Sequence, residues 1–199
     1  MNARSIALIV TFAAIAIALN TIRIPTIYWP GFSYHFNEIP IVVAFLLFGP
    51  KIGVLVGVLH LAGQLALFPI GPAGIVAYPM GLVALLLMLF GVYLASRFIS
   101  RRAASEKPLN EKKRTIYLTA FAAASRGGIM PFLAYGVMYR VLLPLVLGIS
   151  IPEAYIAALV PSFVLYNVTV PLYTVPIAYV VATKVGRYLK IEPRLFRQV

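Results

Sequence analysis

The hydrophobic positions of this chain fall into long apolar segments separated by short polar stretches or by stretches rich in proline and glycine. Six such segments cover approximately residues 5–22, 38–49, 52–68, 74–96, 115–147 and 154–183. The first lies between Arg4 and Arg23 and contains no charge. At about 1.5 Å per helical residue it is just long enough to cross a hydrocarbon core of about 30 Å. The pattern predicts an all-α integral membrane protein, a six transmembrane helix bundle forming one domain over residues 1–199.

The second segment is short, because Ile39–Gly49 contains only eleven residues. Asn37 is the predicted N-cap, since its side-chain oxygen can accept hydrogen bonds from free backbone N–H groups. Glu38 follows where the helix dipole favours an anion. Gly49 and Pro50 end the segment. Its length is compatible with a short span or with a re-entrant helix, and the pattern leaves both open.

The last two segments are longer than one span needs. Residues 115–147 are interrupted by Gly127, Gly128 and Pro131, so this helix is expected to kink, tilt or protrude. In the third segment, Gly53 and Gly57 stand at the G-x-x-x-G spacing that favours close helix packing. No internal repeat is evident, so the inverted repeats of many secondary transporters find no support.

Composition agrees with a membrane protein. The 199 residues are 62% hydrophobic with a mean hydropathy of +0.95, whereas about half of a soluble domain is apolar. The absence of cysteine excludes disulfides, zinc–thiolate sites and a cysteine nucleophile. Arg4 precedes a long apolar run without a small-residue cleavage site, so no cleavable signal is expected.

The net charge of +12 reflects topology rather than nucleic-acid binding. Basic residues cluster in the hydrophilic stretch 97–114 and in the tail after residue 183, at the ends of apolar segments. The positive-inside rule therefore predicts a basic cytoplasmic loop at 97–114 and a cytoplasmic tail in the cell (plasma) membrane. With six spans both termini are cytoplasmic, and Arg23 faces outside. A re-entrant second segment would place the N-terminus outside and Arg23 inside, and would leave the loop and the tail cytoplasmic.

Motifs for catalysis are missing from the sequence. A phosphate-binding G-x-x-x-x-G-K-[ST] loop is absent, so ATP-driven work would have to come from partners. The two histidines, His35 and His60, are far apart, and the five acidic residues form no paired-carboxylate motif. We expect no catalytic residue, no metal site and no cofactor. His60 is interpreted as a packed or hydrogen-bonded histidine.

Three polar side chains inside the apolar segments need partners. A bare charge in the membrane is costly, so Arg126 should face the bundle interior. It can pair with backbone carbonyls freed near Pro131 or contact a ligand, and both remain open. Arg140 lies near the outer end of its segment and can reach the interface. The amide of Asn167 suits either the edge of a flat heterocycle or a helix–helix hydrogen bond.

Aromatic residues gather between the first two segments. The stretch Arg23–Asn37 carries Tyr28, Trp29, Phe32, Tyr34 and Phe36. They can form an interfacial belt or a lid over a ligand. Elsewhere Tyr78, Tyr135 and Tyr139 are aromatics of the kind that line small-molecule pockets.

Several motifs resemble one family. Phe36-Asn37-Glu38-Ile39-Pro40 followed by Phe48-Gly49-Pro50 resembles the opening of the second helix in the S components of energy-coupling-factor (ECF) vitamin transporters. Arg126-Gly127-Gly128-Ile129-Met130 followed by Leu142-Leu143-Pro144-Leu145 is similar to the fifth helix of the riboflavin-binding subgroup. Asn167 stands where that subgroup has an asparagine in its sixth helix. The resemblance covers nearly the whole chain. It implies six transmembrane helices that bind one vitamin-like solute from outside.

The resemblance also implies partners and site residues. The partners would be a transmembrane coupling subunit and two ATPase subunits. Small residues such as Ala14 and Ala18 on the first helix would dock on the coupling subunit; their spacing equally suits helix packing within this chain, and both interpretations stay open. The first external loop would act as a lid. The implied substrate-binding residues are Tyr34, Phe36, Asn37 and Glu38 at the mouth, with Gln64, Tyr78, Arg126, Met130, Tyr139 and Asn167 deeper.

Two positions depart from the riboflavin pattern. Met138 replaces an asparagine six residues before Pro144, and Val170 replaces a lysine three residues after Asn167. Riboflavin is therefore the best candidate ligand, while another vitamin stays open.

Two other functions stay open at this stage. A stand-alone small-solute transporter working without ATPases would need polar residues along a continuous path. A structural or assembly subunit without a ligand would use Arg126 and Asn167 only to join helices.

Overall fold

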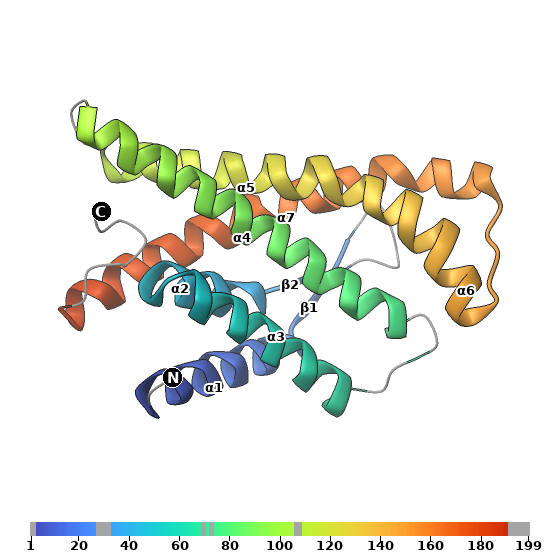
Figure 1. The fold of residues 1–199 in the computed structure, drawn as a ribbon, viewed down its shortest axis with the longest axis horizontal. Helices are drawn as coiled ribbons and strands as arrows, with labels where there is room; N and C mark the ends of the chain where they lie inside the picture. The colour runs from blue at the N-terminus through green and yellow to red at the C-terminus, as the bar shows by residue number, and fades with distance from the viewer. Residues whose placement is uncertain (1–2, 27–32, 69–70, 72–73, 106–108, 191–199) are drawn as a thin grey trace.

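The protein is a bundle of helices with a short β-hairpin at one end (Figure 1). The computed structural model describes residues 3–26, 33–68, 71, 74–105 and 109–190. The helices are α1 (Ala3–Leu19), α2 (Glu38–Phe48), α3 (Pro50–Leu67), α4 (Gly74–Ser105), α5 (Glu111–Leu133), the π-helix η1 (Ala134–Leu142), α6 (Leu143–Leu147) and α7 (Glu153–Tyr188). Strands β1 (Arg23–Pro25) and β2 (Ser33–His35) pair antiparallel, with Ile24 opposite Tyr34.

Four helical stretches in the described part of the chain are long and apolar enough to cross a membrane: α3, most of α4, the continuous run from α5 to α6, and α7. Helices α1 and α2 are shorter and apolar. The start of α1 and the end of α7 lie at one end of the bundle, on the left in Figure 1, and the hairpin lies toward the other end. From the hairpin the chain runs through α2 toward this left-hand end and returns through α3.

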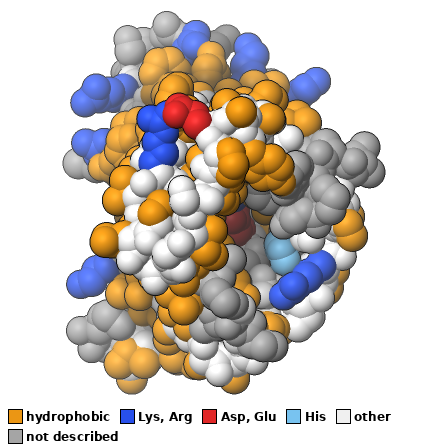
Figure 2. Space-filling view, turned by 90° about the vertical axis from the view of Figure 1, so that its right-hand side faces the viewer, with side chains coloured by type: hydrophobic (Ala, Val, Ile, Leu, Met, Phe, Trp, Pro, Cys, Tyr) orange, Lys and Arg blue, Asp and Glu red, His pale blue; other side chains and the backbone are white. Residues whose placement is uncertain are grey.

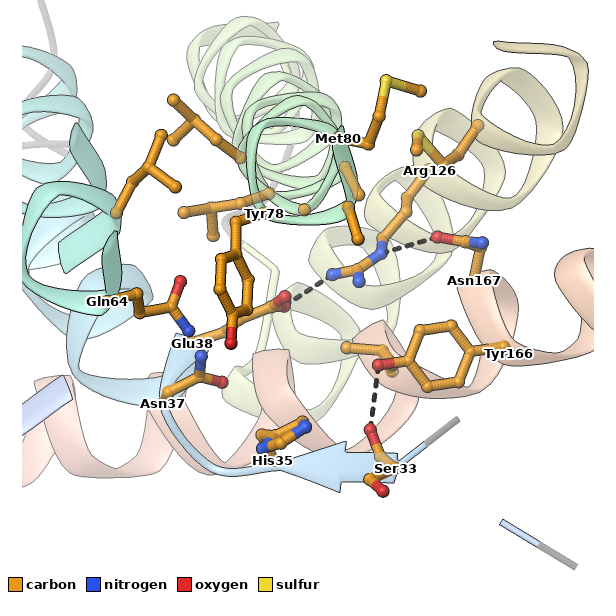
Figure 3. Close-up of a pocket in the computed structure, with 18 of the residues that line it drawn as sticks. Ser33, His35, Asn37, Glu38, Gln64, Tyr78, Met80, Arg126, Tyr166 and Asn167 are labelled. Carbon is orange, nitrogen blue, oxygen red and sulfur yellow. Dashed lines mark hydrogen bonds and ion pairs between the residues drawn. The ribbon is translucent and has the colours of Figure 1, made fainter. Parts of the chain in front are cut away.

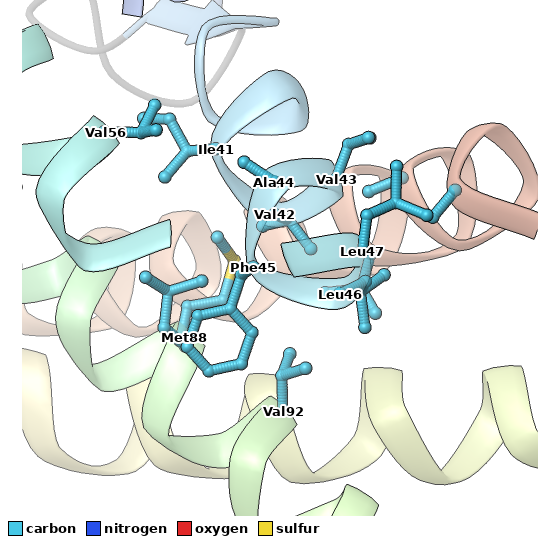
Figure 4. Close-up of a cluster of buried hydrophobic side chains, with 14 of the residues drawn as sticks. Ile41, Val42, Val43, Ala44, Phe45, Leu46, Leu47, Val56, Met88 and Val92 are labelled. Carbon is cyan, nitrogen blue, oxygen red and sulfur yellow. The ribbon is translucent and has the colours of Figure 1, made fainter. Parts of the chain in front are cut away.

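Helix α2 is the centre of the bundle. Every side chain from Ile41 to Leu47 is buried against neighbouring helices, including Val56 of α3 and Met88 of α4 (Figure 4). A helix that is apolar on all sides is stable only when it is enclosed in this way. Its eleven residues extend only about 17 Å. This length is shorter than a hydrocarbon core of about 30 Å.

The α2–α3 connection is as tight as the sequence predicts. Gly49 has φ of +96°, which glycine tolerates without strain, and Pro50 occupies the first turn of α3. Both glycines of the G-x-x-x-G motif lie at close contacts. A Cβ on Gly53 would lie 2.5 Å from Cβ of Phe45, and one on Gly57 would lie 2.9 Å from a methyl of Leu85.

The long fifth segment is bent, as predicted. Pro131 removes a backbone donor, and the helix continues after Leu133 as the nine-residue π-helix η1 before α6. Figure 1 shows the yellow-to-orange helix turning away from its first direction over this region. Wider π turns re-form backbone hydrogen bonds after such an interruption.

Three predicted boundaries are wrong. The stretch 97–114 is mostly helical, because α4 continues to Ser105 and α5 begins at Glu111. The Asn110 side chain accepts a hydrogen bond of 2.9 Å from the backbone N–H of Lys113 and so caps α5. Helix α7 likewise runs to Tyr188 rather than to residue 183. Arginine and lysine favour helices, so the helices continue beyond the apolar segments.

Candidate functional site

A cavity of about 350 Å³ lies beyond the N-terminus of α2. It is enclosed by side chains from α3, α4, α5, η1 and α7 and by residues of the hairpin. Figure 2 looks onto this end of the bundle and shows a hollow in which an acidic and a histidine side chain are visible. The polar residues that line it are Asn20, Arg23, Ser33, His35, Asn37, Glu38, His60, Gln64, Tyr78, Arg126, Tyr139, Tyr166, Asn167 and Tyr173. Pockets of this size hold small molecules.

An ion pair crosses the deep part of the cavity. Nη1 of Arg126 lies 2.5 Å from Oε2 of Glu38, and Nε of Arg126 donates to Oδ1 of Asn167 at 3.1 Å (Figure 3). Asn167 in turn donates to the Phe163 carbonyl at 2.9 Å. Arg126 is 3% exposed and Glu38 is 15% exposed. The partner of Arg126 is therefore a carboxylate, not the carbonyls near Pro131, and Glu38 also lies in the first turn of α2, where the dipole favours it.

A second polar group is made of amides and an imidazole. Nδ2 of Asn37 lies 3.2 Å from Oδ1 of Asn20 and 3.2 Å from Nε2 of His60. An amide nitrogen only donates, so Nε2 of His60 accepts, and the proton of the neutral ring lies on Nδ1. Gln64 follows His60 by one turn and also lines the cavity. We refer to Asn20, Asn37, His60 and Gln64 as the amide cluster.

The predicted N-cap role of Asn37 is wrong. Its backbone is already helical, with φ −60° and ψ −27°, and its side chain makes no capping hydrogen bond. The side chain turns instead to Asn20 and His60, two buried polar partners that would lose a hydrogen bond without it.

Tyrosines join the hairpin to α7. The hydroxyls of Tyr166 and Tyr173 donate to the carbonyls of Ser33 and His35 at 3.0 and 2.8 Å. Tyr34 bonds the Thr169 hydroxyl at 2.8 Å and stacks on Tyr166 with ring centroids 5.6 Å apart. Strand β2 is thereby held against α7 at the cavity. Of the loop aromatics, Tyr28, Trp29 and Phe32 lie outside the described residues.

His35 contributes a polar edge at the mouth. Its Nδ1 is buried and has no hydrogen-bond partner among the described residues. Burial of the ring, together with the nearby Arg23, lowers the pKa of His35 below its ordinary value of 6.5. At neutral pH the ring is therefore uncharged and can offer a hydrogen bond to a bound molecule.

The remaining wall is apolar and polarizable. Met80, Met130, Met138, Phe163 and Val170 all line the cavity. The ring of Tyr139 meets that of Phe163 edge to face at a centroid distance of 5.6 Å. Thioethers and aromatic edges pack well against flat rings. The bend at η1 positions this wall, because η1 carries Met138 and Tyr139.

Eight of the ten predicted substrate-binding residues line this cavity: Asn37, Glu38, Gln64, Tyr78, Arg126, Met130, Tyr139 and Asn167. Tyr34 and Phe36 do not, because their rings pack against Tyr166 and Tyr173 on α7. The prediction missed His60, Tyr166 and Tyr173. The one-turn spacing of His60 and Gln64, and the tyrosines on either side of Asn167, were the available signals.

Two other predicted features lie away from the cavity. Ala14 and Ala18 are on the exposed side of α1, whereas Ala13 and Ala16 are buried. The guanidinium of Arg140, which is partly exposed, contacts both Glu153 and the Tyr135 hydroxyl. Within the described residues, no group of three or more histidine, cysteine or acidic side chains could hold a metal ion.

Replacing Tyr173 with phenylalanine is expected to loosen the hairpin without unfolding the bundle. The change removes the hydrogen bond to the His35 carbonyl, and one such bond contributes about 1 kcal/mol. Amide exchange at residues 33–35, followed by mass spectrometry, should become about fivefold faster. Tyr188→Phe, at the exposed end of the same helix, is the control. Equal exchange in the two variants would mean that the tyrosines do not hold the hairpin.

A scan against protein-family models and a search of curated proteins found no match to this sequence. The fold, however, is similar to the structure of the S component of a bacterial ECF transporter, with a TM-score of 0.70 and 20% sequence identity. The likeness covers 94% of this chain and 98% of that chain. The expected S-component-like membrane bundle is therefore confirmed as the fold.

Proposed function

We propose that this chain is the substrate-binding S component of an ECF-type ABC importer. The observation that carries the proposal is the cavity beyond α2, which is open at one end of the bundle and lined by hydrogen-bonding side chains and by residues of the hairpin, in a chain with this fold. The chain binds a vitamin-like small molecule and itself catalyses no reaction. Partner subunits supply the work of ATP hydrolysis.

The packing under the cavity favours a binding subunit over a stand-alone transporter. Helix α2 and its neighbours form a dense apolar core from Ile41 to Leu47, with Val92 and Ala178 fully buried beside it. The polar residues that line the cavity lie at one end of this core, and beyond them the buried side chains of the described residues are mostly apolar. A solute bound in the cavity cannot pass α2 without a large rearrangement, which fits a subunit that depends on partners.

The position of the cavity supports uptake from outside. The basic residues at the end of α4, at the start of α5 and at the end of α7 lie at the end of the bundle opposite the cavity, where α1 begins. By the positive-inside rule that end is cytoplasmic. The cavity then opens to the exterior of the plasma membrane, where a solute would be captured.

The partners are a transmembrane coupling subunit and two ATPase subunits. The exposed Ala14 and Ala18 lie one turn apart on α1, so their side presents small residues to the membrane. Such a face lets another helix approach closely. It is the docking surface that we assign to the coupling subunit.

Riboflavin is the first ligand to test. A flat ring system matches the wall of methionines and aromatics, and hydroxyl groups match the amide cluster. Met138 and Val170 both line the cavity, so the ring would meet apolar side chains at those two positions. Another flat heterocycle could pack against the same methionines and aromatic rings.

The test uses the full chain purified in detergent. Native mass spectrometry should detect one co-purifying small molecule, and riboflavin should bind one to one with quenching of flavin fluorescence. If a different heterocycle co-purifies, the proposed S-component function stands, and that molecule takes the place of riboflavin as the ligand. A chain that is empty and ignores a vitamin panel would contradict the proposal in favour of a stand-alone transporter or an assembly subunit.

A further inference from the structure

The charges of the deep cavity neutralise each other. Arg126 and Glu38 form an ion pair, and Asn167 takes a further guanidinium hydrogen bond. An anionic ligand that approached Arg126 would compete with Glu38, and a cationic ligand that approached Glu38 would compete with Arg126. Either would leave one buried charge without its partner, which is strongly unfavourable in a low-dielectric site. Binding of a charged ligand group next to the Arg126–Glu38 pair is therefore unfavourable.

Apart from Arg23 at the mouth, the other polar groups of the cavity carry no charge. His60 accepts from Asn37 as a neutral imidazole, while Asn20 and Gln64 are amides. Burial lowers the pKa of His35, which keeps this ring neutral as well. Arg23 is the remaining charged residue among the described lining residues, and it is exposed to solvent at the mouth. Solvent weakens its attraction for an anion.

Figure 3 shows how these groups divide the cavity. Glu38 lies between Asn37 and Gln64 on one side and Arg126 and Asn167 on the other, and Met80 lies away from the amide side. A ligand that fills the space meets hydrogen-bonding amides at one end and thioethers and aromatic rings at the other. Neither end supplies a free counter-charge.

We propose, on the basis of the proposed function, that the ligand is an uncharged amphipathic molecule whose polar part is recognised by hydrogen bonds to the amide cluster. The Glu38–Arg126 pair is the specificity determinant. It leaves room for hydroxyl, amide or carbonyl groups and disfavours carboxylates, phosphates and ammonium groups. The ring or chain of the ligand lies against the methionine wall.

The test compares matched probes that differ in charge. The purified full chain is titrated with riboflavin and riboflavin 5′-phosphate, nicotinamide and nicotinate, pantothenol and pantothenate, and the neutral thiochrome with cationic thiamine. Binding is measured by equilibrium dialysis, and any co-purifying molecule is released and its charge at pH 7 determined by electrophoresis. In the pair that binds, the neutral member should bind roughly 100-fold more tightly.

A substitution of Glu38 should change the ratio of the affinities for the neutral and the charged probes. Glu38→Gln keeps the shape of the side chain but leaves Arg126 without a counter-charge, so the ratio should shift at least about tenfold toward the anionic probe. Glu153→Gln, which alters an exposed ion pair away from the cavity, should leave the ratio unchanged. If Glu38→Gln does not fold, the ratios of the unaltered chain decide alone.

Each outcome is informative. A neutral ligand with the predicted shift supports the inference. Tighter binding of a charged member by the unaltered chain, or release of an ionised co-purifying molecule, overturns the inference while keeping a small-molecule binding function. Failure to bind every probe, together with no co-purifying molecule, contradicts the proposed function and the inference with it.

Discussion

Glu38→Gln should lower the free energy of unfolding by about 3–5 kcal/mol, one of the two largest effects that the structure predicts. The change leaves the guanidinium of Arg126, which is 3% exposed, without a counter-charge. Breaking a buried pair by neutralising one partner is costly because the other charge stays in a medium that solvates it poorly. The thermal midpoint in detergent, followed by far-UV circular dichroism, should fall by roughly 6–20 °C for a chain of this length.

A matched control comes from the second ion pair at the same end of the molecule. Glu153→Gln removes the carboxylate that pairs with Arg140, but these side chains are 69% and 46% exposed. Solvent screens such pairs, so the loss should be below about 1 kcal/mol. Adding Arg126→Met to Glu38→Gln should recover part of the stability, because no buried charge remains. Equal losses for Glu38→Gln and Glu153→Gln would mean that the buried pair does not hold α2 to α5.

The apolar pattern predicted the bundle because helix periodicity and length are local properties of the chain. The bend of the fifth segment followed from Pro131, and the turn after α2 followed from Gly49 and Pro50. Helix ends at the basic stretch 97–114 could not be found in this way. Charged residues end an apolar segment but do not end a helix. Helix α4 therefore continues past the end of its apolar segment, and α5 begins before the start of the next one.

The sequence predicted which residues line the site but not which of them contact one another. Arg126 had to find a partner, yet Glu38 lies 88 positions away in the sequence. Only the packing of α2 and α5 against the same helix, α7, brings the two side chains together. Asn37 illustrates the reverse case. Its position favours a cap, but Asn20 and His60 compete for the same side chain, and these tertiary contacts prevail. Tyr34 and Phe36 were assigned to the site by the resemblance, although α7 offers them aromatic partners outside the cavity.

The second large effect concerns the crossing of α4 and α5. Gly91 of α4 lies directly against the backbone of α5. A Cβ added to Gly91 would lie 2.4 Å from the Phe121 carbonyl oxygen and 2.7 Å from Cα of Ala122. Both obstacles are backbone atoms, so a rotamer change cannot relieve the overlap. The helices would have to separate, and the neighbouring side chains Met88 and Leu118, which are fully buried, would lose contacts.

Gly91→Ala should therefore destabilise the protein by about 3 kcal/mol, the upper end of the usual range for overpacking, and lower the thermal midpoint by roughly 6–12 °C. Gly128→Ala on α5 is the matched control, since a Cβ there meets nothing within 4 Å. Alanine is the better helix former by about 1 kcal/mol, so the control should be neutral or slightly stabilised. Similar midpoints for the two variants would mean that α4 and α5 do not approach this closely. The arrangement that places Arg126 opposite Glu38 would then also be in question, because the α4–α5 contact helps to position α5.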